Sequence, residues 1–324
     1  MDLIVANLLS PPILFFALGL GASLLRSDLK LPEALYSTLT IYLLCAIGFK
    51  GGVALANAGL NAVLLPGIAA IALGTCIPLW SFFFLKFFSK LSTADCAAIA
   101  AHYGSVSAVT FIAATNYLKV LNVPFEPYAS AFLAIMESPA ILVGIMLAKV
   151  GSQQKGGRPN LKIIKPALRE SLLGKSIFLL IGSLLIGWAS GESGSRATEA
   201  FFVTPFVGIL CLFLLEMGIV AGRRVSSLPK LGPFLILFGT LMPLFNGIMG
   251  VWLGQWSGLS MGGATLLGVL SASASYIAAP AAVRISIPEA NPTYYLTVSL
   301  AITFPFNLSI GTPIYFAFAS WLYS

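Results

Sequence analysis

Charged residues are scarce in this sequence. Only 9% of the 324 residues are Asp, Glu, Lys or Arg, whereas a soluble domain carries about 25%. Hydrophobic residues make up 58% of the chain, and the mean hydropathy is +0.95. The apolar runs are long enough for membrane-spanning helices, and the alternating pattern of an outer-membrane barrel is absent. The composition therefore predicts an all-α polytopic membrane protein.

Several functional signatures are missing as well. The four cysteines have no metal-ligand spacing, and there is no phosphate-binding loop or nucleophile–base pattern. We therefore expect no enzyme and no cofactor. The net charge of +7 is concentrated in loops, where it sets membrane topology rather than indicating a nucleic-acid partner. The start of the chain lacks a basic segment, which predicts no cleaved signal peptide.

Lysine and arginine predict the orientation in the bilayer. Fifteen of the 18 fall in the polar connector 151–173, at its edges or in loops on the same side, and only Lys50, Lys119 and Arg196 fall on the other. Basic loops face the cytoplasm, so both termini should lie outside an inner or plasma membrane. The ten expected spans are 10–25, 33–56, 61–88, 92–118, 126–150, 174–190, 198–222, 231–256, 260–285 and 292–323.

The two halves of the chain match in sequence. Because each half has five spans, an odd number, the second half should be inverted relative to the first, which is typical of secondary transporters. We expect a first five-helix repeat at 1–150, a cytoplasmic connector at 151–173 and a second, inverted repeat at 174–324. The matched stretches are Gly74–Trp80 with Gly239–Phe245, Ile47-Gly48 with Met217-Gly218, Glu126-Pro127 with Asn291-Pro292, and Pro139 with Pro305.

Small polar residues interrupt the fourth and ninth spans at matched positions, 168 residues apart for Ser105 and Ser273 and again for Ser107 and Ser275. A broken helix leaves free N–H groups that favour an anion and free carbonyls that can hold a cation such as Na⁺. Neither break contains Lys or Arg, which favours a small anion. The expected substrate-binding residues are Gly104, Ser105, Val106, Ser107, Ser273, Ala274, Ser275 and Tyr276.

Ionisable residues inside spans add a second signal. A carboxylate within the membrane is costly and marks function by default, so Glu137 is a candidate for cation coupling, together with Ser138, Ser271 and Thr110. His102 is more readily explained by packing than by proton transfer. Lys50 ends the second span, where it snorkels to the outer interface or attracts anions to an outer vestibule. Neither break has an acidic residue, which argues against a proton antiporter.

These residues resemble a known family. The block Ser273–Pro280, with Arg284 and Gly311-Thr312-Pro313 after it, is similar to the sodium-dependent bicarbonate permeases of the cyanobacterial SbtA type. The resemblance implies ten helices in two inverted repeats, divided into core and gate domains, and a homotrimer. It also implies Na⁺-coupled bicarbonate import by an elevator-like motion, with bicarbonate between the two breaks, and regulation by a cytoplasmic PII-like protein.

The chain also differs from the cyanobacterial permeases. It has Tyr276 where they carry an acidic residue, Glu137 in place of an aspartate, and a shorter connector. The main hypothesis is a bicarbonate importer. Two alternatives stay open: a permease of the same fold for another small anion, such as an organic carboxylate, and a membrane sensor that binds a ligand without transporting it.

Overall fold

The computed structural model describes residues 3–152 and 173–324 of the chain. It is 84% helical, with no strand among the described residues, which confirms the all-α prediction. Eight helices are long and apolar enough to cross a membrane. The protein is therefore a multi-pass membrane protein.

These eight helices coincide with eight of the ten expected spans. The other two expected spans contain shorter apolar helices: α2 (Pro11–Leu24) in the first and α12 (Met261–Ala272) in the ninth. The remaining long elements are α3 (Glu33–Ala58), α4 (Leu60–Phe88), α5 (Thr93–Gly104), α6 (Ala108–Val120), α7 (Ala131–Ser152), α9 (Lys175–Phe202), α10 (Phe206–Val225), α11 (Gly232–Trp256), α13 (Ala278–Ser286) and α16 (Thr312–Leu322). Short elements are α1 (Leu3–Leu8), η1 (Pro127–Ser130), η2 (Leu228–Lys230), α14 (Pro292–Thr297), η3 (Val298–Thr303), α15 (Phe304–Phe306) and η4 (Asn307–Gly311).

The expected end of the sixth span at Ser190 coincides with a break in the helix, whereas the stretch 192–197, expected as a loop, is helical. Gly191 has non-helical dihedrals (φ 55°, ψ −151°), which glycine tolerates, so two helical segments meet there at a kink within α9. The second segment runs to Phe202. The polar side chains of this stretch are exposed or half-buried, and Glu192 accepts a hydrogen bond from Asn57 (2.8 Å). The helix therefore holds them without burying them.

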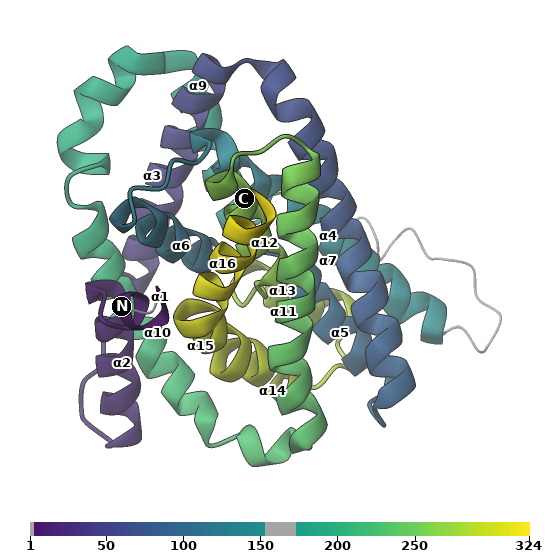
Figure 1. Cartoon of the computed structure of the whole chain (residues 1–324). Coiled ribbons are helices and arrows are strands. Elements are labelled where there is room, and N and C mark those ends of the chain that lie inside the picture. Colours follow the sequence, from purple (N-terminus) through teal and green to yellow (C-terminus); the bar gives the residue numbers. More distant parts are fainter. Residues whose placement is uncertain (1–2, 153–172) are drawn as a thin grey trace.

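Four helices form one group, on the left of Figure 1. Within it, α3 packs along α9 and α2 packs along α10. Glycines allow both approaches: a Cβ at Gly48 would overlap the carbonyl oxygen of Leu180, and one at Gly218 would overlap that of Phe16. Gly48 and Gly218 belong to one of the stretches matched between the two halves, so equivalent positions make equivalent contacts.

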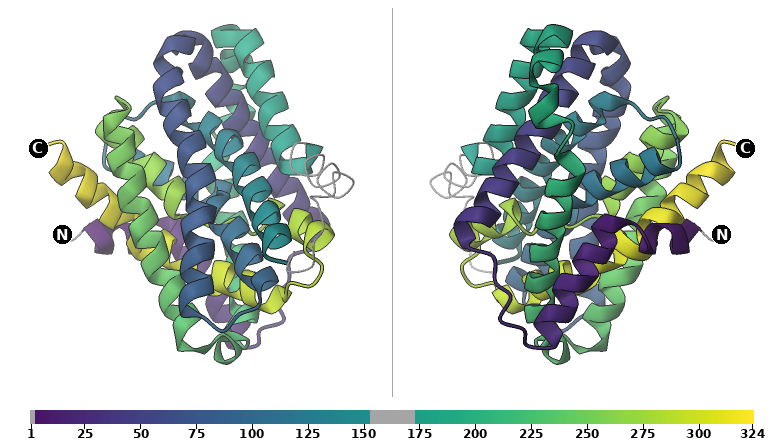
Figure 2. Two further views of the ribbon diagram at one scale, coloured as in Figure 1. Left: turned by 90° about the vertical axis from the view of Figure 1, so that its right-hand side faces the viewer. Right: turned by 90° about the vertical axis from the view of Figure 1, so that its left-hand side faces the viewer.

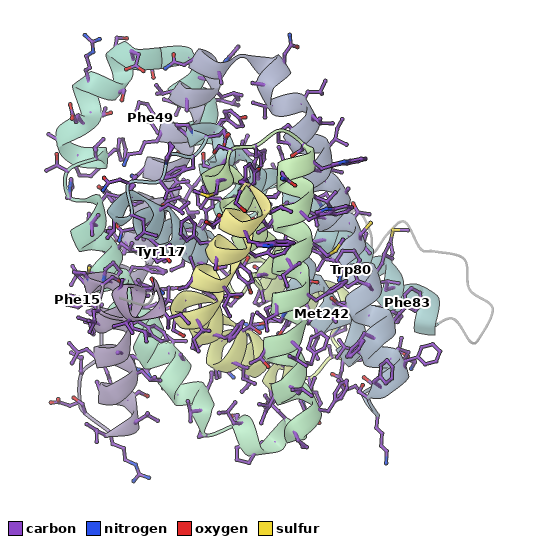
Figure 3. All side chains as sticks on the ribbon, in the orientation of Figure 1. Phe15, Phe49, Trp80, Phe83, Tyr117 and Met242 are labelled. Carbon is purple, nitrogen blue, oxygen red and sulfur yellow. The ribbon has the colours of Figure 1, made fainter. Side chains whose placement is uncertain are left out.

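The other helices form a second group. Here α4, α5 and α7 pack together, as do α11, α12 and α16. Within this second group, the cluster of α4, α5 and α7 meets the cluster of α11, α12 and α16 along α4 and α11. There the Trp80 indole N–H donates to the Asn246 side-chain oxygen (2.8 Å). Figure 3 shows Trp80 and Met242 beside this seam. Figure 2 shows both chain ends projecting from one flank, where α1 packs on α16.

Candidate functional site

The structure interrupts both matched helices. Residues 105–107 separate α5 from α6, and residues 273–277 separate α12 from α13. Gly104 differs from its expected place in the break: it is the last residue of α5, where a Cβ would collide with the Pro78 ring. The second break is longer because Tyr276 and Ile277 also lie outside the helices.

Local capping explains why the helices stop and restart here. Ser107 is the N-cap of α6, and its hydroxyl accepts from the Thr110 N–H (3.2 Å). Such a cap satisfies one of the amide groups that a helix start leaves unpaired. At the other break, the Asn307 side chain donates to the carbonyl of Ala272, the last residue of α12 (2.8 Å). Polar groups thus replace the backbone bonds that each break removes.

The two breaks hydrogen-bond to each other. The Ser107 N–H donates to the Ser273 hydroxyl (2.9 Å), and the Ser275 N–H donates to the His102 carbonyl (2.8 Å). Ser107 and Ser273 are both at least 95% buried. Figure 1 shows α5, α6, α12 and α13 gathered in the middle of the molecule. Segments about 170 residues apart therefore form one buried polar centre.

Tyr276 completes this centre. The Ser107 hydroxyl donates to the Tyr276 oxygen (3.3 Å) and accepts from the Thr110 hydroxyl (3.0 Å). The Tyr276 ring packs edge-on against Phe304, with centroids 5.2 Å apart. Beyond it, the Ser275 hydroxyl accepts from the Ala279 N–H in the first turn of α13 (3.2 Å). The starts of α6 and α13 thus each have a serine hydroxyl that accepts from a backbone N–H of their first turn.

A small cavity lies beside these groups. Its volume is about 30 Å³, which is room for about one water molecule. The starts of α6 and α13 give its wall partial positive charge, and buried Glu137 contributes the one carboxyl group among the described lining residues. The lining residues are Leu44, Val106, Ser107, Ala108, Leu133, Glu137, Leu180, Ser275, Tyr276 and Ile277.

Sequence comparison identifies the family. A match to the Na⁺-dependent bicarbonate transporter superfamily covers residues 11–320 and so includes both breaks and the cavity. The chain belongs to this superfamily. Among curated proteins, none matches the chain. The match confirms the family that the sequence motifs indicated. A transporter family also agrees with the eight long apolar helices of this bicarbonate-transporter homologue.

Five of the expected site residues of this superfamily member line the cavity: Val106, Ser107, Ser275, Tyr276 and Glu137. Gly104, Ser105, Ser273 and Ala274 are not among the described lining residues, and the Ser105 hydroxyl is buried without a hydrogen-bond partner among the described residues. The Ser271 hydroxyl donates to the Leu267 carbonyl of its own helix (2.8 Å). Thr110 does not line the cavity, but its hydroxyl donates to the Ser107 hydroxyl, which does. The side chain of Ser138 lies outside the described residues.

His102 serves the site through its backbone. Its ring stacks on Tyr295 at 4.5 Å, and Nδ1 donates to the Ala98 carbonyl (2.7 Å). Nε2 is buried and has no partner among the described residues. The histidine is thus packed, as its isolation in the sequence suggested, while its carbonyl receives the Ser275 N–H.

Five residues that line the cavity were not expected from the sequence: Leu44, Ala108, Leu133, Leu180 and Ile277. Leu44 of α3 and Leu180 of α9 close the cavity from the four-helix group, whereas the other lining residues belong to the second group. A leucine in an apolar helix has the same pattern whether it faces lipid or a site, so no sequence signal marks these two.

Carboxylates hydrogen-bond at the ends of the broken helices that lie away from the breaks, at the starts of α5 and α12. Glu126 accepts from the Ser260 N–H (2.7 Å) and hydroxyl (3.0 Å) at the start of α12. At the start of α5, the Asp95 carboxylate accepts from the Asn291 N–H (2.7 Å). Each broken helix is therefore tied to the loop that opens the last span of the other half, at the matched residues Glu126 and Asn291.

Proposed function

We propose that this chain is a Na⁺-coupled importer of bicarbonate that works by alternating access, with an elevator-like movement. The observation that best supports this proposal is the hydrogen bond from the Ser107 N–H to the Ser273 hydroxyl (2.9 Å). It places a helix-start donor, of the kind that binds anions, between two broken helices of a bicarbonate-transporter superfamily member.

In this proposal, a bicarbonate oxygen takes the place of the Ser273 hydroxyl on the Ser107 N–H. The Ser107 and Ser275 hydroxyls are the next available groups, because both residues line the cavity. Bicarbonate, with its carbon and three oxygens, needs more room than a cavity of about 30 Å³. Binding therefore requires the two breaks to separate, which couples substrate entry to movement of the helices.

In this proposal, the negative charge of the Glu137 carboxylate explains why bicarbonate transport requires Na⁺. Its carboxyl group lines the same cavity as the anion donors and is 6% exposed. When ionised, it disfavours a second negative charge nearby, and a bound Na⁺ offsets that repulsion. Bicarbonate should therefore bind well only together with Na⁺. Thr110, Ser138 and Ser271 remain candidate sodium-coupling residues.

The position of the cavity supports the elevator-like movement. Its wall combines Leu44 and Leu180 of the four-helix group with residues of the second group, so sliding one group past the other would open it alternately. We assign α2, α3, α9 and α10 to the gate domain and the rest to the core. The matched contacts of Gly48 and Gly218 support two inverted repeats, at 1–150 and 174–324, joined by the connector 151–173.

The remaining expectations also belong to this proposal. They are a homotrimer, a PII-like regulator, an inner or plasma membrane location and both termini outside. They rest on the resemblance and on the distribution of basic residues. Most of the connector 151–173, where a cytoplasmic regulator would have basic residues to bind, lies outside the described residues.

Uptake by reconstituted protein tests the proposal. Proteoliposomes should accumulate labelled bicarbonate only with an inward Na⁺ gradient. Ser107→Leu and Ser275→Leu should abolish uptake, because leucine fills the cavity and removes the hydroxyls. Ser226→Leu is the matched control, since this serine is exposed and bonds only to the nearby Arg223 carbonyl. Uptake without a gradient, or wild-type rates in both site variants, would contradict the proposal.

One observation favours a second candidate substrate. Tyr276 places a phenol on the cavity wall beside Ser107, where it could shape a pocket for an organic carboxylate. Competition by acetate or pyruvate against labelled bicarbonate separates these substrates. A ligand that binds at one per chain and is never accumulated would instead identify a sensor.

A further inference from the structure

A second, much larger pocket lies between the two helix groups. Its volume is about 540 Å³, within the range of small-molecule sites. Its walls are mostly apolar, and two lysines, Lys50 of α3 and Lys119 of α6, face it. The lining residues are Ile47, Lys50, Gly51, Phe111, Thr115, Lys119, Asn122, Val123, Pro124, Phe125, Pro127, Ser130 and Phe206.

The polar groups of this pocket suit an anion. None of the lining residues that the structure describes is Asp or Glu, and the neighbouring Glu126 carboxylate accepts hydrogen bonds from Ser260. The Lys50 ammonium lies 4.4 Å from the centre of the Phe206 ring, which holds it at the wall of the pocket. Ser130 is 4% exposed, and its hydroxyl has no hydrogen-bond partner among the described residues. A buried donor without a partner is costly, so a bound acceptor would satisfy it.

The pocket lies next to the small cavity. Two elements line both: α3 contributes Leu44 to the cavity and Ile47 to the pocket, and α6 contributes Ala108 to the cavity and Phe111 to the pocket. Each step is three residues, or about 5 Å along a helix. The pocket is therefore about one helical turn from the proposed bicarbonate position, on the side of Lys119.

We infer that this pocket is a second anion site, in which Lys50, Lys119 and the Ser130 hydroxyl hold a carboxylate-type anion before it enters the cavity. Bicarbonate and organic carboxylates share this chemistry, and the apolar walls also accept an organic body. The onward path of the anion rests on the proposed function, whereas its binding does not. Two positive charges in this pocket, about one helical turn from the cavity, raise the local anion concentration and so the rate at which an anion enters the cavity.

Transport kinetics test the role in entry. Lys50→Met and Lys119→Met together should raise the bicarbonate concentration for half-maximal uptake by roughly tenfold and leave the maximal rate unchanged. Arginine at both positions should retain wild-type affinity, because it keeps the charge. The difference between wild type and double variant should shrink in high salt, which screens exposed charge. Arg196→Met, which removes an exposed positive charge far along α9, is the matched control.

Chemical labelling tests binding without transport. The purified chain is treated with 4-sulfophenyl isothiocyanate, which is anionic, or with neutral phenyl isothiocyanate. In both cases the neutral lysine amine adds to the isothiocyanate carbon, and its proton moves to the adjacent nitrogen to give a thiourea. Peptide mass spectrometry should show a preference for the anionic reagent at Lys50 and Lys119, relative to Lys230, of at least roughly fivefold. Benzoate, bicarbonate or both should slow this labelling.

The outcomes separate the two proposals. Protection by benzoate alone or bicarbonate alone supports the site and identifies its ligand as organic or inorganic. Protection in a protein that does not transport bicarbonate supports the site and contradicts the proposed function. Normal uptake with no protection, no preference for the anionic reagent and an unchanged half-saturating concentration in the double variant overturns the inference and leaves the proposed function intact.

Discussion

Ser273→Ala should make bicarbonate bind more tightly, although Ser273 lies in the proposed binding region. Its hydroxyl accepts the Ser107 N–H (2.9 Å) and donates to the Leu270 carbonyl (2.8 Å). In the empty site this hydroxyl occupies the position that we assign to a bicarbonate oxygen. Removing it takes away a competitor for the Ser107 N–H.

The magnitude follows from the groups left behind. The Leu270 carbonyl keeps a partner, because the Ser273 N–H also donates to it (3.1 Å). The Ser107 N–H alone loses its acceptor, and an unsatisfied buried donor costs about 1–3 kcal/mol. We take about 1 kcal/mol, because water can enter the space left by the hydroxyl. The empty state is destabilised by this amount and the bound state is not, so the affinity should rise about fivefold.

Thermal unfolding in detergent, with and without bicarbonate and Na⁺, measures this effect. The variant should unfold at a lower temperature than wild type without ligand and should gain more from saturating ligand, because binding to the folded state adds to stability. Thr265→Val is the matched control, since its buried hydroxyl bonds only to the Met261 carbonyl within the same helix. The half-saturating bicarbonate concentration for uptake should fall in parallel.

A weaker affinity in the variant would refute the reasoning. It would mean that the Ser273 hydroxyl donates to the bound anion, and that its bond to the Ser107 N–H does not compete with substrate. An unchanged affinity with a lower unfolding temperature would mean that the two breaks stay bonded while the substrate is present.

Two further changes test the coupling and the fold. Glu137→Gln should raise the half-saturating Na⁺ concentration at least roughly tenfold, because the side chain keeps its shape but loses the charge that attracts the cation; an unchanged Na⁺ dependence of uptake would exclude it from coupling. Glu126→Ala should lower the free energy of unfolding by about 2 kcal/mol, because the start of α12 loses two hydrogen bonds to a carboxylate. Glu126→Gln retains one acceptor and should lose less, and equal unfolding temperatures in all three proteins would contradict this assignment.

The sequence predicts most of the helical layout because the membrane imposes long apolar segments. Boundaries at Glu33 and Phe88 agree with the structure to the residue. The predicted span end at Ser190 agrees with the kink at Gly191, but the loop predicted after it is wrong. Residues 192–197 are helical because their polar side chains stay exposed or half-buried, so the helix does not bury them.

The candidate site is less accessible to sequence reasoning. Small polar residues mark both breaks, because serine can replace backbone bonds when a helix stops. The partner of each serine has no local signal: Ser107 bonds to Ser273 and Ser275 to His102, each across more than 160 residues. The pocket with Lys50 and Ser130 likewise depends on how α3 approaches η1.

By itself the sequence determined that this is an all-α membrane protein with two matched breaks, and its motifs placed it in the bicarbonate transporter superfamily. Hydropathy, charge asymmetry and spacing are properties of neighbouring residues, so they can be read along the chain. Only the tertiary structure decided that Ser273 satisfies the donor of Ser107, that Leu44 and Leu180 close the cavity, and that Lys50 and Lys119 face one pocket. These are contacts between distant segments, and packing alone sets which of many similar side chains meet.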